Sequence, residues 1–294
     1  MNKPDLDHFL HRHGLLRVGE SAHWQALTGG VSSDIWRADL PDGTLCVKRA
    51  LAELKVQAEW RAPLDRNGYE WAWLQFASRH CPDNVPRPLA HDAQAGLFAM
   101  SFLPPDRHPV WKEQLLRGEV SVDTARGVGA LVGRLHAASA GDAQVARDFD
   151  SNANFHALRL EPYLLATTRA HPAVAPQLEQ LAQRTGALHS VLVHGDVSPK
   201  NILVGPLGPV LLDAECAWYG DPAFDVAFCL NHLLLKGFLR PQARPALAEA
   251  FAVLWAAYRP LIGWERAEAL EARAAALLPA LMQARCRTAQ QGQR

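Results

Sequence analysis

The first hundred residues alternate short apolar runs of strand type with turn residues, whereas the rest of the chain mostly follows helical periodicity. Residues 23–30 and 33–40 each have the pattern of a strand, and a loop of small residues joins them. Pro41-Asp42-Gly43 supplies turn chemistry before a third run at 44–50. This pattern predicts a three-stranded meander.

A helix is expected after the meander. Asp65 can cap it, and apolar side chains recur at helical spacing from about residue 66 to residue 79. The apolar positions on one helical face are Tyr69, Trp73, Leu74 and Ala77. The pattern therefore adds one helix to the three strands, and this helix needs a partner for its apolar face.

The first lobe is expected to end at a pair of prolines. Residues 96–105 form an apolar, strand-like run that stops at Pro104 and Pro105, where neither a helix nor a central strand can continue. We therefore divide the chain into an N-terminal lobe, residues 1–102, and a C-terminal lobe, residues 103–294. A small lobe rich in strands followed by a large helical lobe is an α+β architecture.

The second lobe is expected to consist mainly of helices. Residues 121–139 carry apolar side chains at helical spacing, and the glycines among them would allow a neighbouring element to pack closely. From Phe224 onward the pattern is again that of several helices. One compact strand-like block, residues 191–213, interrupts the helical pattern.

Composition narrows the classes of partner. The 294 residues are 49% hydrophobic and 20% charged, which is typical of a folded globular chain, and 30 Lys+Arg balance 30 Asp+Glu. This balance argues against the basic surface that nucleic acids or anionic membranes attract. There is no Cys-x-x-Cys pair, no signal-peptide pattern and no stretch near the roughly 18 apolar residues of a membrane span. We expect a cytoplasmic protein with reduced thiols, and we find no signal for an oligomeric state.

Candidate chemistry is concentrated in the block VLVHGDVSPKNILVGPLGPVLLD at 191–213. Its polar residues follow the ends of strand-like runs, with Asp196 and Asn201 around a short loop and Asp213 at the end of a hairpin. Phosphoryl transfer from ATP needs a carboxylate that accepts a proton from the attacking hydroxyl, and oxygen ligands for Mg²⁺. The spacing favours Asp196 as the base, and Asn201, Asp213 and Glu215 as metal ligands.

These motifs resemble those of the aminoglycoside phosphotransferase and choline kinase family. The resemblance rests on the HGD motif at 194–196 with Asn201, and on the DAE motif at 213–215. Residues 213–236 and 47–56 are most similar to the methylthioribose kinase branch of this family. The resemblance implies a two-lobed protein-kinase-like fold, ATP and Mg²⁺ as cofactors, and a small molecule as the hydroxyl acceptor.

The resemblance also implies roles for residues outside the block. Lys48, on the third strand, would hold the α- and β-phosphates and pair with a glutamate. Glu53, Glu59 and Glu70 are the candidates, and Glu70 is favoured because it lies within the predicted helix, one turn before apolar positions. Asp225 would steady the backbone of the loop that carries the base.

Two segments are expected to contact the nucleotide. The loop between the first two strands could cover phosphates with backbone N–H groups, and Gly30, Ser32 and Ser33 are its candidate binding residues. This loop departs from the G-x-G-x-x-G pattern, which disfavours a protein kinase. By resemblance in position, Ser101 and Leu103 belong to the hinge that meets adenine.

Two residues of the block need a separate interpretation. His194 is expected to be structural and to hold the loop by hydrogen bonds. Lys200, between the base and the first metal ligand, either stabilises the transferred phosphoryl group or faces solvent. Both interpretations of Lys200 remain open at this point.

Charge bears on the acceptor. Residues 221–294 contain nine Lys+Arg against six Asp+Glu, and residues 145–190 contain four of each, which disfavours a polycationic aminoglycoside. We expect a neutral or anionic, sugar-like alcohol; the alternatives are an aminoglycoside, a choline- or ethanolamine-type acceptor, or a non-catalytic nucleotide-binding regulatory protein. Five aromatic residues either stack on a sugar ring or belong to the core: Trp218, Tyr219, Trp255, Tyr258 and Trp264.

Overall fold

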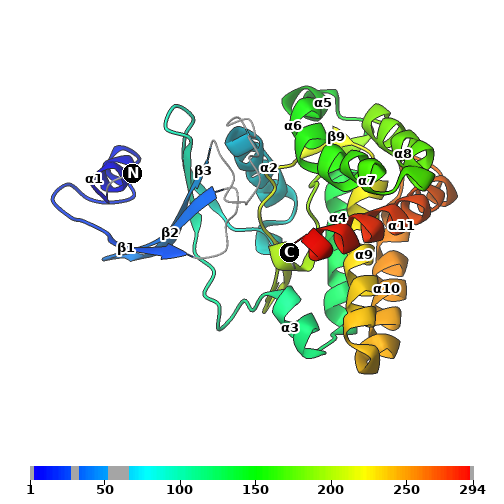
Figure 1. Ribbon diagram of the computed structural model, residues 1–294. Helices are drawn as coiled ribbons and strands as arrows, with labels where there is room; N and C mark the ends of the chain where they lie inside the picture. Colours follow the sequence, from blue (N-terminus) through cyan, green and yellow to red (C-terminus); the bar gives the residue numbers. More distant parts are fainter. Residues whose placement is uncertain (1–2, 28–32, 52–65, 292–294) are drawn as a thin grey trace.

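The structure is a computed structural model that describes residues 3–27, 33–51 and 66–291. A small lobe built on a sheet stands beside a large lobe of helices, and helix α2 lies between them (Figure 1). This is the α+β, two-lobed arrangement that the hydrophobic pattern predicts. Ligand sites often lie where two such lobes meet.

The small lobe holds a five-stranded antiparallel sheet in the order β1-β2-β3-β5-β4. Its strands are β1 (His23–Leu27), β2 (Ser33–Leu40), β3 (Gly43–Ala50), β4 (Pro88–Asp92) and β5 (Leu97–Ser101). The predicted meander is confirmed by β1, β2 and β3. Helix α1 (Lys3–Arg12) buries Leu6, Phe9 and Leu10 in one apolar cluster with residues of this sheet.

Helix α2 (Arg66–His80) confirms the helix predicted at 66–79. Its side chains Trp73, Leu74 and Ala77 are buried, and they belong to the same hydrophobic core as the large lobe. The short 3₁₀ turn η1 (Pro82–Asn84) follows, and Asn84 donates a hydrogen bond to the carbonyl of Pro209. The small lobe is therefore anchored to the large one by apolar packing as well as by polar contacts.

The large lobe is dominated by helices. They are α3 (Trp111–Arg117), α4 (Val122–Ser139), α5 (Ala143–Asp148), α6 (Asn152–Phe155), the π-helix η2 (His156–Leu165), α7 (Ala166–Ala170), α8 (Ala175–Ala187), α9 (Ala223–Leu239), α10 (Arg244–Tyr258) and α11 (Ala267–Gln291). Short 3₁₀ turns lie at Pro172–Val174, Pro199–Asn201, Pro241–Ala243 and Arg259–Leu261.

Helix α4 matches the helix predicted at 121–139. The hydroxyl of Ser121 caps it by accepting the N–H of Thr124 at 3.1 Å. A Cβ at Gly129 would lie 2.1 Å from the carbonyl oxygen of Leu254 on α10, so only glycine permits this helix contact. The close packing expected from the glycines of this segment is confirmed at Gly129.

Four short strands support the polar residues of the 191–213 block. Strand β6 (Val191–Val193) pairs with β9 (Trp218–Gly220), and β7 (Ile202–Gly205) forms a hairpin with β8 (Gly208–Leu211). All three residues of β6 are buried, which explains its unbroken apolar sequence. The loops at the ends of β6 and β8 open toward the small lobe.

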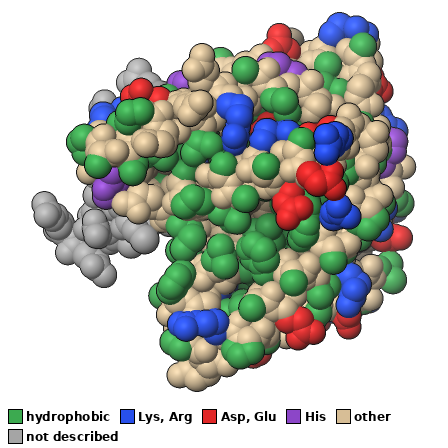
Figure 2. Space-filling view, turned by 90° about the vertical axis from the view of Figure 1, so that its right-hand side faces the viewer, with side chains coloured by type: hydrophobic (Ala, Val, Ile, Leu, Met, Phe, Trp, Pro, Cys, Tyr) green, Lys and Arg blue, Asp and Glu red, His purple; other side chains and the backbone are tan. Residues whose placement is uncertain are grey.

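The outer face of the large lobe, with α8 and α11, is hollowed and has hydrophobic side chains in the hollow (Figure 2). A groove of about 620 Å³ lies between the 170–181 segment and α11. Charges of both signs are interspersed on this face rather than gathered by sign. Within the described ranges, no helix is long and apolar enough to cross a membrane.

Candidate active site

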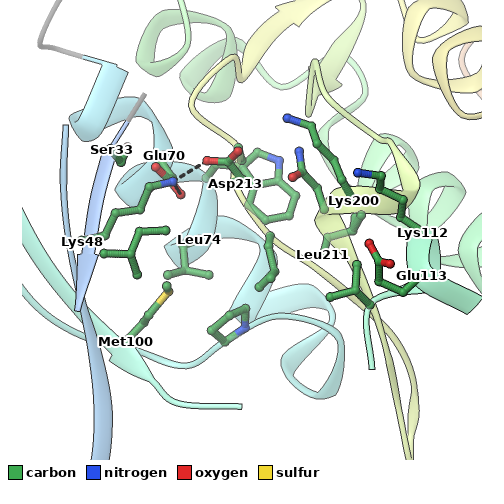
Figure 3. Close-up of a pocket in the computed structure, with 17 residues that line it drawn as sticks. Ser33, Lys48, Glu70, Leu74, Met100, Lys112, Glu113, Lys200, Leu211 and Asp213 are labelled. Carbon is green, nitrogen blue, oxygen red and sulfur yellow. Dashed lines mark hydrogen bonds and ion pairs between the residues drawn. The ribbon is translucent and has the colours of Figure 1, made fainter. Parts of the chain in front are cut away.

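A cleft of about 440 Å³ lies between the two lobes and collects six of the site residues singled out from the sequence, but neither Asp196 nor Glu215 (Figure 3). Its polar lining from the small lobe is Ser33, Lys48 and Glu70, and from the large lobe Lys112, Glu113, Lys200, Asn201 and Asp213. Apolar side chains such as Met100, Leu74 and Leu211 complete the walls. A concave site with an apolar lining and a few convergent charges suits a nucleotide-sized ligand.

The loop at 194–201 is held by its backbone. The N–H groups of His194 and Gly195 donate to the two carboxylate oxygens of Asp225, at 2.7 and 2.8 Å. Asp225 is fully buried in the first turn of α9, and its Oδ2 also lies 3.2 Å from Nε2 of His136. The Nδ1 of His136 lies 2.9 Å from the hydroxyl of Tyr258. Helices α4, α9 and α10 therefore fix this loop together.

The loop requires a glycine at position 195. Gly195 has φ of 78°, and a Cβ there would lie 2.5 Å from the carbonyl oxygen of Cys216. His194 accepts the N–H of Asp196 at its Nδ1, 3.2 Å away, and its ring packs edge-on against Trp73. Because burial lowers its pKa, His194 stays neutral, in keeping with the structural role expected of it.

Asp196 is a buried carboxylate with one free oxygen. Its Oδ2 lies 2.9 Å from Nη2 of Arg159 and 3.0 Å from Nζ of Lys200, whereas its Oδ1 has no hydrogen-bond partner. Burial alone would raise the pKa of Asp196, but the two cations outweigh burial and hold this pKa well below its usual value. The side chain is ionised at neutral pH, and its Oδ1 is a buried acceptor atom without a partner; Asp196 itself does not line the cleft.

Asn201 and Asp213 offer oxygen atoms to the cleft. The Asn201 amide nitrogen donates to the backbone carbonyl of Asp196 at 3.2 Å, which leaves its side-chain oxygen for another partner. Asp213 adopts φ of 66°, the one positive φ at a non-glycine position in the described ranges. Such a left-handed conformation costs free energy and occurs often at functional sites.

Lys48 joins the two lobes at the bottom of the cleft. Its Nζ lies 2.7 Å from Oε1 of Glu70 and also pairs with Asp213 (Figure 3). Burial alone would lower the pKa of Lys48, but Asp213 and Glu70 outweigh burial and hold it above its usual value. Burial raises the pKa of Glu70 to about 7 despite the contact with Lys48.

Glu215 pairs with a residue that the sequence did not single out. The Nε of Arg66 lies 3.1 Å from Oε2 of Glu215, and the Arg66 side chain is fully buried at the start of α2. Arg159, which contacts Asp196, was also missed. Neither arginine belongs to a recognisable motif, and a buried arginine cannot be distinguished by sequence from the many exposed ones.

The donor set suits a magnesium-nucleotide complex better than a metal held by protein alone. Asn201, Asp213 and Glu215 carry oxygen atoms of the hard kind that Mg²⁺ prefers, and the first two line the cleft. In the part of the chain that the structure describes, no cluster of three or more His, Cys, Asp or Glu side chains forms a metal cage. Mg²⁺ typically takes one or two carboxylates and completes its shell with phosphate and water, so the residues present fit.

Of the residues expected to contact the nucleotide, some line the cleft, some lie away from it and some lie outside the described residues. Ser33 opens β2, is buried and lines the cleft, whereas Gly30 and Ser32 lie outside the described residues. Glu53, Glu59 and the helix cap Asp65 also lie outside them. Ser101 is the last residue of β5 and Leu103 lies two positions further on; neither lines the cleft. The Ser101 backbone N–H is already bonded to the carbonyl of Arg87.

Lys200 is partly exposed and paired with Asp196, and its contact with the transferred phosphoryl group stays a prediction. Its side chain is 50% exposed, yet its ammonium is paired with Asp196 and lines the cleft. Of the aromatic residues considered for sugar stacking, Trp218 and Tyr258 are buried in the core and cannot face a substrate. Trp218 stacks instead on Phe155.

Comparison with known proteins identifies relatives of this chain. The methylthioribose kinase of Yersinia pseudotuberculosis is 26% identical over 219 residues, covering 65% of this chain and 53% of that protein. The chain therefore spans about half the length of the methylthioribose kinases that it matches.

Solved structures share the fold over nearly the whole chain. The apoenzyme of macrolide 2′-phosphotransferase MphH from Brachybacterium faecium has a TM-score of 0.52 at 25% identity, covering 94% of this chain and 98% of that one. Amicoumacin kinase hAmiN, in complex with AMP-PNP, Ca²⁺ and Ami, has a TM-score of 0.58 at 16% identity, covering 97% and 87%. Residues 23–270, most of the chain, match the APH family, described as the phosphotransferase enzyme family, and the chain belongs to it.

Proposed function

We propose that this protein is an ATP- and Mg²⁺-dependent phosphotransferase that phosphorylates a hydroxyl group of a small, neutral or anionic, sugar-like molecule. The observation that carries the proposal is the arrangement at Asp196: an ionised, buried carboxylate with one unpartnered oxygen, next to Asn201. Asn201 and Asp213 line the cleft beside it. Residues 1–102 would form the nucleotide-binding lobe, and residues 103–294 would carry the catalytic loop and acceptor site.

In this mechanism Asp196 is the general base. Its free Oδ1 accepts a hydrogen bond from the acceptor hydroxyl and then the proton, while Oδ2 stays paired with Arg159 and Lys200. The backbone bonds to Asp225 keep the loop from moving as the charge changes. Catalysis rests mainly on positioning and charge stabilisation, because no covalent intermediate with the protein is needed.

Asn201, Asp213 and Glu215 would hold Mg²⁺, and Lys48, oriented by Glu70, would hold the phosphates. Bound Mg·ATP supplies the phosphoryl group and neutralises its developing charge. The hAmiN complex, which shares this fold, contains AMP-PNP and Ca²⁺. The proposed remaining contacts with the nucleotide are Gly30, Ser32, Ser33, Ser101, Leu103 and Lys200.

The acceptor class follows from charge near the base. Two cations, Arg159 and Lys200, lie against Asp196, and the surrounding 145–190 segment has no excess of acidic residues. A multiply protonated aminoglycoside would be repelled there, whereas a neutral or anionic alcohol would not. The named relatives with 25% identity or more act on methylthioribose and on macrolides, the first being a sugar derivative.

The test is a Mg²⁺-ATP turnover screen with methylthioribose, other sugars, macrolides, amino alcohols and aminoglycosides. We expect the highest kcat/KM for a neutral or anionic sugar-like alcohol, with little dependence on salt. An aminoglycoside with the highest kcat/KM, falling as salt rises, would contradict the acceptor class. ATP binding without turnover on any acceptor would favour a regulatory protein instead.

A further inference from the structure

Arg159 lies at an irregular point of the large lobe. The segment His156–Leu165 is a π-helix with Pro162 inside it, and three successive residues, Leu158, Arg159 and Leu160, are buried. A regular α-helix at a surface buries one stripe rather than three neighbours in a row. The wider π turn therefore brings an arginine into the interior, and π turns are frequent at functional sites.

The guanidinium of Arg159 joins two consecutive residues of the loop at 194–201. Its Nη2 lies 2.9 Å from Oδ2 of Asp196, and its Nε donates to the backbone carbonyl of Gly195. A third bond, from Nη1 to the carbonyl of Leu158 at 2.7 Å, ties the group to its own helix. The rings of Tyr163 and Phe228 lie about 6 Å from the guanidinium carbon.

We propose that Arg159 is a positioning residue that fixes the carboxylate of Asp196 so that Oδ1 faces the acceptor hydroxyl. This inference rests on the proposed function. The terminal torsion of an aspartate is broad, so a carboxylate without fixed partners samples many orientations. Arg159 removes this freedom by holding Oδ2 and the preceding carbonyl at once.

Positioning the Asp196 carboxylate in this way requires the planar guanidinium group of an arginine. Arginine presents donors in a rigid plane, whereas a lysine ammonium is a single point on a flexible stem and cannot reach both acceptors with the same geometry. Lys200 contacts the same Oδ2 but is half-exposed and makes no contact with Gly195 that would set the loop backbone. Arg159 therefore fixes orientation, and Lys200 adds charge.

The decisive experiment is a double-mutant cycle between Arg159→Met and Asp196→Asn, with Arg159→Lys as the conservative variant. We expect Arg159→Met to lower kcat about 10- to 100-fold, the range for lost supporting partners of a site, with KM for ATP within about twofold. Arg159→Lys should remain at least about fivefold below the wild type. In the Asp196→Asn background, Arg159→Met should lower kcat by less than about threefold, because its effect passes through Asp196.

Arg169→Met is the matched control. Arg169 lies on the next helix and makes an exposed ion pair with Glu161 at 2.7 Å, so its loss should leave kcat unchanged. The turnover rate is divided by the concentration of nucleotide-binding sites, which calorimetry measures. This normalisation removes the effect of any unfolded protein in the preparation. Additive effects in the cycle, or an Arg159→Met kcat within twofold of the control, would overturn the inference.

A crystal structure of the Arg159→Lys variant gives a second measurement that needs no turnover. A rotated or multiply oriented Asp196 carboxylate supports the inference, and an unchanged carboxylate overturns it. A wild-type protein that phosphorylates no acceptor would overturn the proposed function while leaving this structural measurement decisive for Arg159.

Discussion

Asp196 and Asp213 are both held by cations, but the cations come from different parts of the molecule. Asp196 is paired with Arg159 and Lys200, which belong to the large lobe like the aspartate itself. Asp213 also belongs to the large lobe, yet its partner Lys48 lies on β3 of the small lobe. The Arg66–Glu215 pair crosses between the lobes in the same way.

The different origin of these cations distinguishes the surroundings of Asp196 from those of Asp213 and Glu215. Both cations that pair with Asp196 belong to the large lobe, so this pairing needs no ion pair across the cleft. The carboxylates of Asp213 and Glu215 pair with Lys48 and Arg66 across the cleft. A metal ion bound there would compete with these two cations for the same carboxylates. The proposed base is thus paired within one lobe, whereas the proposed metal ligands Asp213 and Glu215 are paired with residues of the other lobe.

The largest effect is expected from replacing Asp196, the proposed base. Asp196→Asn should lower kcat by about 10²- to 10⁴-fold, the usual contribution of a general base, with nucleotide affinity nearly unchanged. Turnover and calorimetry with Mg²⁺-ATP check both parts. A variant with the wild-type kcat would show that Asp196 is not the base.

The second prediction concerns Asp213, whose ion pair crosses between the lobes. Asp213→Ala should weaken Mg²⁺-dependent nucleotide binding by about 10- to 100-fold, because the proposed Mg²⁺ site loses an anionic ligand. Asp123→Ala, at a side chain 94% exposed on α4, is the control. Calorimetry with and without Mg²⁺ measures the effect; the assignment fails if the metal dependence is the same as in the control.

Lowering the pH should reduce the contribution of Asp196 to the free energy of unfolding. In the wild type its folded-state pKa lies below the ordinary value of 3.8, so the stability it contributes is present above that value and is lost as pH falls. In Arg159→Met, burial opposes ionisation and this contribution disappears. The difference in unfolding free energy between the two proteins should therefore shrink by about 1 kcal/mol from pH 7 to pH 3.

Urea unfolding at several pH values measures this difference. The Arg169→Met variant should follow the wild type throughout, because its ion pair is exposed. A difference between wild type and Arg159→Met that stays constant with pH would mean that the pair with Asp196 contributes nothing specific to acid sensitivity.

The smallest expected effect is at Lys200. Its side chain is half-exposed, so its pair with Asp196 is screened by water and contributes at most about 1 kcal/mol. Lys200→Met should therefore lower kcat by no more than about fivefold. A loss as large as that of Asp196→Asn would show that the pair with Asp196 is not the main role of Lys200, and that its proposed contact with the nucleotide dominates turnover.

The fold was largely predictable because its elements have strong local signals. The meander at 23–50, the helix at 66–80 and the glycine-containing helix α4 all follow from periodicity, turn residues and caps. The π-helix at 156–165 was not predictable. Its apolar spacing resembles that of an ordinary helix, and the extra residue per turn is decided by tertiary packing.

Within the candidate site, the sequence singles out those residues that belong to a recognisable motif or to a predicted element. Asp196, Asn201 and Asp213 have fixed spacing, and Glu70 could be chosen because it lies within a predicted helix. Arg66 and Arg159 reach the site from distant segments, 149 residues from Glu215 in the first case. Sequence spacing carries no information about such partners, since only the folded chain brings them together.

The bonds that hold Asp225 also determine when the site forms during folding. Asp225 reaches loop residues 30 and 31 positions away and lies against His136, 89 positions away, while His136 contacts Tyr258 across 122 positions. These contacts close only after α4, α9 and α10 have packed, because long loops must first be ordered. Activity should therefore appear late in refolding and disappear together with the helical lobe, so that enzyme activity reports the completion of the lobe's fold.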